Sequence, residues 1–367
     1  MKSKIRVAVV FGGRSAEHEV SLQSALSIIA ALDSDRYDIV PIGIDTGGKW
    51  HVLDPEHFVN APENPSRISL GKSVHELSLV PGEDRSAMLR GAQNLPAIDV
   101  VFPVLHGTYG EDGSIQGLLR MLDVPFVGSS ILGSALGMDK EMTKRLFTEA
   151  GLPTPRYMVL RAGEPLDQGG VERTLGWPVF VKPANMGSSV GVTKVHSAAD
   201  LREAAANAFE YDRKILIEEA IEGRELECSV LGNDSPRASV VGEVVPQHHE
   251  FYSYEAKYLD EHGATLIIPA RLDAPIVDRV RDLAVKAFGA LCLSGMARVD
   301  FFLRGGEVLL NEVNTIPGFT QISMYPKLWE ATGMPYPELL NELIRLAIER
   351  HEHESRLRTR YMSGVRS

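Results

Sequence analysis

Cysteine is scarce in this 367-residue chain, which contains two cysteines, Cys228 and Cys292, and no CxxC pair. That scarcity argues against a disulfide framework and against a thiolate metal site. Both residues lie among apolar neighbours that are typical of strands or helices, so we expect two buried thiols.

Long apolar runs and excess positive charge are also missing. No run of roughly 18 apolar residues, the length that a membrane helix requires, occurs in the chain. Residues 1–4 lead directly into a strand without the apolar region of a signal peptide. With 38 Lys and Arg against 49 Asp and Glu, the net charge of -11 argues against binding to nucleic acid or to an anionic membrane. We therefore expect a cytoplasmic protein in which any phosphate site is a local pocket of lysines and backbone amides.

The chain is long enough for two or three globular domains, with 44% hydrophobic and 24% charged residues. An apolar run from Ile5 to Phe11, a helical pattern ending near Leu32 and a second run from Ile39 to Ile44 predict a βαβ unit. Residues 97–105 predict another buried strand, whereas residues 50–94 predict irregular structure with short elements. Glycine-rich loops follow the first and third of these strands, at the end where parallel sheets carry functional loops.

The rest of the chain predicts further strands and helices. Residues 177–182 and 190–195 are joined by a glycine and serine loop, which favours a hairpin over the strand, loop and helix of a P-loop. Strands dominate from 224 to 317 apart from a helix at about 275–291, and a last helix is predicted at about 336–349. We expect residues 351–367 to form a frayed, charged tail.

The most informative polar residues lie on two apolar runs near the end of the chain. Arg298 and Asp300 on the first, with Glu312 and Asn314 on the second, place a guanidinium, two carboxylates and an amide where an ordinary core accepts none. Oxygen ligands without a cysteine or histidine cluster suit magnesium, which commonly arrives with the phosphates of a nucleotide. The group indicates ATP chemistry. Two exposed carboxylates on an edge strand are the plainer alternative, although the apolar flanks favour a buried pair of strands.

The connection between these two strands tests that interpretation. Opposite residues of an antiparallel pair share a face, so a plain two-residue turn at Gly305 and Gly306 would place Asp300 opposite Asn311 and turn Glu312 to the other face. A magnesium site therefore requires a bulge or a loop of odd length, such as a three-residue loop with a left-handed glycine.

A second candidate group surrounds Lys182 and the loop at residues 183–191. The lysine, the hydroxyls of Ser188 and Ser189 and the loop amides suit phosphate oxygens. A plain surface turn is the alternative, but an unpaired ammonium at the end of a buried strand argues for a function.

Several single residues have both a functional and a plainer interpretation. Glu218, Glu219 and Glu225 offer acceptors for an adenine amino group and ribose hydroxyls, or form a solvated strand end. Glu17 binds a ligand or complements a helix dipole. His106 is either a substrate contact or a satisfied loop histidine.

Six stretches occur in the same order as the motifs of one known family: residues 12–21, 106–113, 138–140, 181–191, 254–258 and 311–318. Together they resemble the D-alanine-D-alanine ligase family of the ATP-grasp superfamily. The matches span residues 5–325, and six motifs in order are far more specific than any one of them.

The resemblance implies an α/β fold of three domains, at residues 1–128, 129–222 and 223–367, the first with a Rossmann-like parallel sheet. ATP would bind between the second and third domains. A D-alanine carboxylate would attack the γ-phosphate to give an acyl phosphate and ADP. Two magnesium ions, replaceable by manganese, would bind Asp300, Glu312 and Asn314 and bridge the phosphates. Many relatives carry a lysine where this chain has Glu219, so we expect a backbone contact there. The implied ATP contacts are Lys140, Lys182, Ser189, Glu218, Glu219, Ile221, Glu225 and Lys257.

The resemblance also implies how two D-alanine molecules bind. The amine of the second attacks the acyl phosphate, and Arg298 and the Gly318 amide are expected to stabilise the oxyanion. A lid at residues 252–258 would exclude water. The product would serve peptidoglycan precursor synthesis, and the family implies a homodimer. The implied catalytic residues are Glu17, Ser188, Tyr258, Arg298 and Gly318, and the implied substrate contacts are Glu17, His106, Arg298, Gly318, Ser323 and Met324.

Three alternatives stay open at this point. A D-alanine-D-lactate ligase would use nearly all the same residues, although Tyr258 favours the dipeptide product. A nicotinamide oxidoreductase is suggested by the βαβ unit, but Gly12 and Gly13 do not match GxGxxG. A nucleotide-binding scaffold without catalysis would not require Arg298 and its three polar neighbours together.

Overall fold

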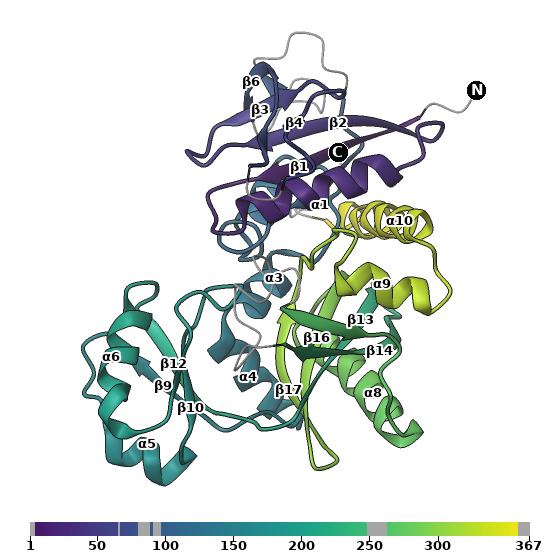
Figure 1. Ribbon diagram of the computed structural model, residues 1–367. Coiled ribbons are helices and arrows are strands. Elements are labelled where there is room, and N and C mark those ends of the chain that lie inside the picture. The colour runs from purple at the N-terminus through teal and green to yellow at the C-terminus, as the bar shows by residue number, and fades with distance from the viewer. Residues whose placement is uncertain (1–3, 65–66, 80–88, 91–96, 248–262, 359–367) are drawn as a thin grey trace, which may run out of the picture.

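The computed structural model describes residues 4–64, 67–79, 89–90, 97–247 and 263–358. Its strands form three main sheets, each with its own packed core, and a fourth sheet of two short strands, and the expected mixed α/β class is confirmed (Figure 1). In the part of the chain that is described, no helix is both long and apolar enough to cross a membrane.

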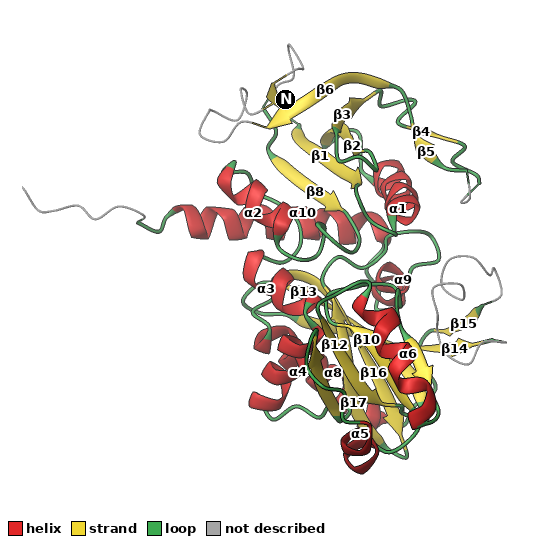
Figure 2. Cartoon of the chain, turned by 90° about the vertical axis from the view of Figure 1, so that its left-hand side faces the viewer, coloured by secondary structure: helices red, strands yellow, loops and turns green. Residues whose placement is uncertain are grey.

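The first sheet contains the predicted βαβ unit. Its three parallel strands lie in the order β2, β1, β8, and helix α1 connects the first two (Figure 2). The glycine-rich loops that follow β1 and β8 line a pocket of about 290 Å³ at the carboxyl ends of these strands. The bounds are β1 Ile5–Gly12, α1 His18–Ala31, β2 Tyr37–Ile44, β8 Val100–Val104 and α2 Ser114–Met121.

The described part of residues 50–94 contains the predicted short elements as five strands of two to seven residues, but it contains more strand than the prediction of irregular structure allows. Antiparallel strands β3, β6 and β7 extend the sheet beyond β2, in the order β7, β6, β3, β2. These strands add to an edge and leave much of β6 exposed, so they lack the long apolar runs that mark buried parallel strands. The bounds are β3 Trp50–Leu53, β4 Val59–Asn60, β5 Ser69–Leu70, β6 Ser73–Leu79 and β7 Leu89–Arg90.

The second sheet contains four antiparallel strands in the order β11, β10, β12, β9. Strands β10 and β11 pair directly, so the predicted hairpin around the glycine and serine loop is confirmed. Figure 1 shows α5 and α6 on the outer side of this unit. The bounds are β9 Tyr157–Arg161, α5 Gln168–Leu175, β10 Val179–Pro183, β11 Thr193–Val195, α6 Ala198–Phe209 and β12 Lys214–Glu219.

The third sheet contains five antiparallel strands in the order β15, β14, β13, β16, β17. Helix α8 packs on one face, and α4 joins the same core through Phe147. The bounds are α3 Ile131–Met138, α4 Lys140–Glu149, β13 Arg224–Gly232, β14 Arg237–Pro246, β15 Ala264–Ile267, α8 Ala274–Ala290, β16 Gly295–Arg304 and β17 Glu307–Asn314.

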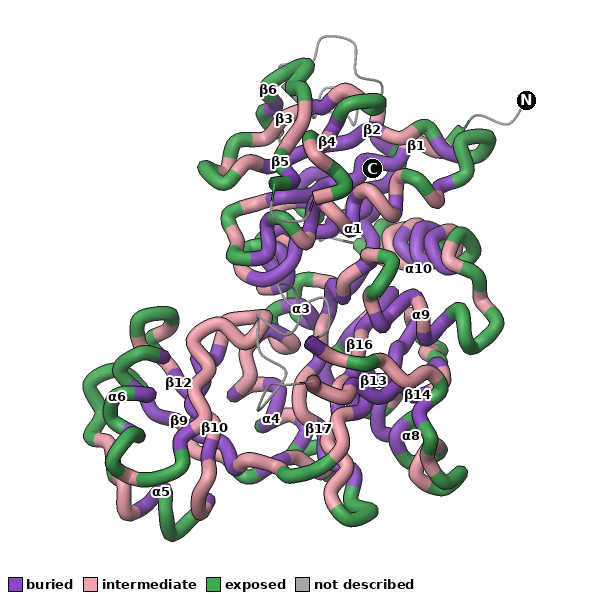
Figure 3. The backbone as a smooth tube through the Cα atoms, viewed as in Figure 1, coloured by how far each residue is buried: buried purple, intermediate pink, exposed green. Residues whose placement is uncertain are grey.

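Two helices close the fold, α9 at Met324–Ala331 and α10 at Tyr336–Ser355. Helix α10 packs its apolar face into the core of the first sheet, and its buried residues are purple in Figure 3. The prediction of a frayed tail from residue 351 is wrong up to Ser355. Half-buried Arg350 explains this, because its guanidinium donates to the backbone oxygens of Phe126, at 2.8 Å, and Gly128 and so fixes the last turns of the helix.

The two cysteines differ in burial. Cys228 is buried on β13 as expected, and burial raises the pKa of its thiol to about 12. The same expectation is wrong for Cys292, which is exposed. Cys292 follows the end of α8 with a left-handed φ of 54°, and this conformation turns its side chain away from the helix and its core.

Candidate active site

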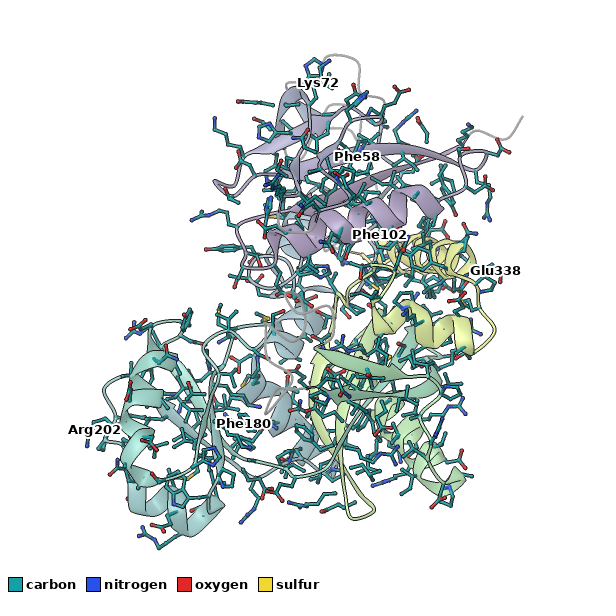
Figure 4. The ribbon with its side chains drawn as sticks, viewed as in Figure 1. Phe58, Lys72, Phe102, Phe180, Arg202 and Glu338 are labelled. Atoms are coloured by element: carbon teal, nitrogen blue, oxygen red, sulfur yellow. The ribbon has the colours of Figure 1, made fainter. Side chains whose placement is uncertain are left out.

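A pocket of about 520 Å³ lies between the second and third sheets. Pockets that bind small molecules and cofactors measure roughly 300–1,000 Å³. Phe180 of β10, labelled in Figure 4, is part of its wall. The predicted site residues that line the pocket are Lys140, Lys182, Ser188, Ser189, Glu218, Glu219, Ile221, Glu225, Arg298, Asp300, Glu312 and Asn314.

The connection between β16 and β17 is a two-residue turn with a bulge beyond it. The turn contains Gly305 and Gly306, whose φ angles are 55° and 92°, so a three-residue loop is wrong. The pairing then shifts by one residue, and Asp300 lies opposite Glu312 instead of Asn311. A bulge at Asn311 therefore places Asp300 and Glu312 on the same face, as a magnesium site requires.

The bulge places the predicted metal ligands on the pocket face. Asp300 lies opposite Glu312, and Arg298 lies opposite Asn314. Val313, between the two polar residues of β17, packs in the core of the sheet. The amide of Asn314 donates to Asp300 Oδ2 at 3.1 Å, so the two strands also meet through side chains.

Arg298 connects this group to a carboxylate that the sequence analysis missed. Its guanidinium donates to both oxygens of Asp300 at 2.7 Å and lies 2.9 Å from Oε2 of buried Glu227. Burial lowers the pKa of Arg298, but Asp300 and Glu227 outweigh that effect and raise it well above its usual value. Glu227 could have been predicted from Glu225, because residues two positions apart on a strand share a face.

The donor atoms of the group fit a hard divalent cation. Asp300, Glu312 and Asn314, with Glu227 beside them, offer oxygen atoms and no nitrogen or sulfur ligand. Among the described residues, no three His, Cys, Asp or Glu side chains converge as a ready ion site. The fit to a divalent cation therefore rests on the oxygen atoms of the carboxylates and on the amide oxygen of Asn314.

Two lysines bind one buried carboxylate on the opposite wall. Glu218 Oε1 accepts from Lys182 Nζ at 2.5 Å, and Oε2 forms an ion pair with Lys144. The side chains of Lys144 and Glu218 are 1% and 2% exposed, while Lys182, at 11%, reaches the pocket. Burial acts to raise the pKa of Glu218, but the two ammonium groups outweigh it and lower the pKa. The sequence analysis missed Lys144, although it lies one helical turn after Lys140 on α4.

The glycine and serine loop contacts the first sheet. Ser188 donates to Glu17 at the start of α1, 171 residues away, and Glu17 makes no capping hydrogen bond with its side chain. Glu17 lies at the N-terminus of α1, so its interaction with the helix dipole stays a prediction beside this contact with Ser188. Ser188 and Ser189 have left-handed φ angles of 49° and 61°, a strain that often marks functional loops. Lys140 donates to the Met186 oxygen of the same loop at 2.5 Å.

Arg156 binds the side chain of Glu219. Both of its oxygens accept from Arg156, at 2.7 to 2.9 Å, and Arg304 lies 3.8 Å away. Burial raises the pKa of Glu219, but Arg156 outweighs this and lowers it. An ATP contact at this position would therefore come from the backbone.

Three of the predicted amino-acid contacts, Gly318, Ser323 and Met324, lie at or shortly before the start of α9. Ser323 precedes Met324, the first residue of α9, and accepts from the amide of Thr320 at 2.9 Å. A Cβ at Gly318 would lie 2.7 Å from Ser323 Oγ, so a larger residue would displace that hydroxyl. His106 is buried, and both its ring nitrogens are already hydrogen-bonded within the protein. A substrate contact by His106 stays a prediction.

Two predicted residues cannot be placed. Lys257 and Tyr258, with the lid at residues 252–258, lie outside the described residues.

Comparisons with known proteins agree with this geometry. The family model described as D-ala D-ala ligase N-terminus matches residues 6–129, and that described as D-ala D-ala ligase C-terminus matches residues 146–345. The D-alanine--D-alanine ligase of Oceanobacillus iheyensis is 51% identical over 366 residues, which cover 98% of this chain and all of the relative.

Solved structures give the same result. The D-alanine-D-alanine ligase of Coxiella burnetii has a TM-score of 0.83 at 37% identity, over 96% of each chain. The D-alanine--D-alanine ligase of Bacillus anthracis complexed with ATP has a TM-score of 0.73 at 30% identity, over 96% of this chain and 100% of that chain. This chain belongs to the D-alanine-D-alanine ligase family of ATP-grasp enzymes.

Proposed function

We propose that this chain joins two D-alanine molecules to D-alanyl-D-alanine with the conversion of ATP to ADP and phosphate. The observation that carries the proposal is one pocket with lysines on one wall and a carboxylate group on the other. Phosphoryl transfer requires from a protein mainly positioning and charge stabilisation, and these two walls supply both. The family of the chain supports the choice of substrates.

In the first step, a D-alanine carboxylate attacks the γ-phosphate and an acyl phosphate forms. Lys140, Lys182 and the loop at Ser188 and Ser189 bind the phosphates. The adenosine lies along residues 218–221, with Glu225 accepting from the ribose. The ATP contact of Lys257, outside the described residues, is part of the same proposal.

Magnesium is the proposed metal, and manganese can replace it. Asp300, Glu312 and Asn314 would bind it, and the family implies two ions. When bound, the metal neutralises charge that develops on the phosphate oxygens. Arg298, which now binds Asp300, is then available to a substrate carboxyl oxygen.

In the second step, the amine of the second D-alanine attacks the acyl phosphate. Glu17 binds the ammonium of the first D-alanine, and Ser188 connects it to the attacking amine, with Tyr258 of the lid completing the network. Arg298 and the Gly318 amide donate to the oxyanion. The second carboxylate binds at the start of α9, at Ser323 and Met324, where unpaired helical amides favour an anion.

The remaining proposals concern the setting of the enzyme. We propose domains at residues 1–128, 129–222 and 223–367, a homodimer, and a cytoplasmic role in peptidoglycan precursor synthesis. A contact of His106 with the substrate belongs to the same set.

The test is the release of phosphate from ATP by the purified chain with magnesium. Release should depend on added D-alanine and should not occur with L-alanine, and chromatography should detect the dipeptide. An Asp300→Asn variant should lose the activity, because it removes one carboxylate ligand. No D-alanine-dependent release at saturating magnesium would refute the proposal.

A further inference from the structure

One residue of the chain, Ile316, has both its backbone polar groups bound by a loop of the first sheet. Its N–H donates to Glu111 Oε1 at 3.1 Å, and its oxygen lies 2.9 Å from His106 Nδ1. A carbonyl oxygen only accepts, so Nδ1 of His106 carries the proton. The partners are more than 200 residues apart in the sequence, and all three residues are buried. The first sheet therefore fixes the orientation of this peptide.

Glu111 is braced by its own loop. Its second oxygen, Oε2, accepts from the Gly107 amide at 2.8 Å, and its own amide donates to the Gly107 oxygen at 2.9 Å. Gly107 has a φ of 72°, and a Cβ there would meet Glu17 Oε2 at 2.8 Å. Both oxygens of Glu111 thus act as acceptors, one toward its own loop and one toward Ile316.

The other end of the short segment is fixed as well. The Phe319 amide donates to Ser24 Oγ on α1 at 3.2 Å, and its oxygen accepts from Tyr336 at 2.8 Å. The Phe319 ring packs edge-on against Phe102 of β8, with centroids 5.8 Å apart, and Figure 4 labels Phe102 in the first sheet. Between the two fixed residues lie only Pro317, whose ring restricts φ, and Gly318.

We propose that Glu111, through its hydrogen bonds to Gly107 and Ile316, positions the Gly318 amide for the amide-forming step. The inference rests on the function proposed above, in which that amide donates to the oxyanion. In this step the amine nitrogen forms a bond to the acyl carbon and loses a proton, which the departing phosphate accepts. The bond from that carbon to the phosphate oxygen breaks, and phosphate leaves with the electron pair. Glu111 lines the pocket, and in this proposal it acts through the backbone.

The variant Glu111→Gln keeps the size of the side chain and replaces one accepting oxygen by an NH₂ donor. Because Gly107 and Ile316 both present N–H groups, one of the two hydrogen bonds must be lost. Burial, followed by the charge of Glu17, raises the pKa of Glu111 to about 8. In assays above that pH, the wild-type chain has an ionised carboxylate at position 111 and Glu111→Gln has a neutral amide.

The experiment measures ADP and dipeptide formed by the full chain with ATP, magnesium and D-alanine. Loss of an oxyanion donor reduces kcat by about a hundred- to a thousandfold, and a displaced donor should cost about ten- to a hundredfold in dipeptide formation. We expect the KM for ATP to stay within about twofold, because no ATP contact changes. The acyl phosphate should then be lost to water, so that ADP exceeds dipeptide.

Asp112→Asn is the matched control. Asp112 lies on the same loop and also accepts two amides, those of Tyr109 and Ser114 at 2.9 Å, but has no hydrogen bond to residues 316–319. This control should form ADP and dipeptide in equal amounts. If Glu111→Gln folds poorly, Ser24→Ala removes the hydrogen bonds to Phe319 and to His106, which both hold residues 316–319, and should also raise the ratio of ADP to dipeptide.

The outcomes separate the two proposals. Equal ADP and dipeptide in both Glu111→Gln and Ser24→Ala would overturn the role of Glu111, whether or not the rates fell. A wild-type chain that forms no dipeptide would refute the proposed function itself, and this inference with it.

Discussion

Replacing Lys144 by methionine tests the charge balance of the lysine wall. Methionine retains the unbranched side chain that fills the space but removes the ammonium. Removing one partner of a buried ion pair costs roughly 3–5 kcal/mol, because it leaves an uncompensated charge. Glu218 keeps Lys182, so the lower end applies and we expect a loss of about 3 kcal/mol.

ATP should increase this cost. In the proposed complex, Lys182 turns to a phosphate, and Lys144 remains as the cation of Glu218. In Lys144→Met, nucleotide binding would leave that buried carboxylate without an ammonium. We expect the Kd for ATP to rise by about ten- to a hundredfold, equivalent to roughly 1.4–2.8 kcal/mol, while the KM for D-alanine changes little.

Native-state hydrogen exchange of the β10 and β12 amides measures the local free energy of opening without requiring two-state unfolding of the whole chain. Isothermal titration with ATP measures the Kd. The matched control is Lys286→Met, which breaks an exposed pair with Asp282 and should cost under about 0.5 kcal/mol.

A double variant, Lys144→Met with Glu218→Gln, separates charge from packing. A neutral amide at 218 still accepts from Lys182 and leaves no uncompensated anion, so it should restore most of the lost stability. The reasoning is refuted if Lys144→Met costs less than about 1 kcal/mol, or if the double variant is no more stable than the single one.

Three other changes test separate features. Glu219→Gln should cost under about 1 kcal/mol, because Arg156 is largely exposed, and should leave the Kd for ATP unchanged; a weaker Kd in titration would show a side-chain contact. A thiol reagent should modify one cysteine of the folded chain, exposed Cys292, and two after unfolding, whereas rapid labelling of Cys228 would contradict its burial. Deleting Asn311 should remove the bulge but keep Asp300 opposite Glu312, because Glu312 then takes the place of Asn311 in a regular ladder, so magnesium-dependent activity should be retained; a folded but inactive deletion variant would contradict the register.

The paired strands β16 and β17 show how far local sequence rules reach. The parity of the Asp300 and Glu312 positions required a bulge or an odd loop, and the structure has the bulge. Parity did not decide between a bulge and an odd loop, because two glycines suit a two-residue turn as well as part of a longer loop. The choice depends on how the strands twist and pack, which is a property of the whole sheet.

The residues that sequence analysis missed have partners far away in the chain. Lys144 is an ordinary helix residue until Glu218 arrives from another sheet, and Glu111 is an ordinary loop acid until Ile316 comes within hydrogen-bond distance. Motifs identified Lys140, Lys182 and Arg298, because those stand beside glycines or on strands where a charge is conspicuous. Buried ionic partners have no such local signal, since their environment is made by tertiary contacts.

Different sheets of the molecule supply the groups proposed for the two chemical steps. The walls that would bind the nucleotide and the metal come from the second and third sheets, through Lys182 and Asp300. The groups proposed to act on the amino acids depend on the first sheet, since Ser188 donates to Glu17, and Ile316 is bound by Glu111. A change that loosens the first sheet against the other two should therefore impair amide formation before it impairs ATP binding. Water would then reach an acyl phosphate that the chain can still make, which is why the ratio of ADP to dipeptide is a more sensitive readout of this assembly than total turnover.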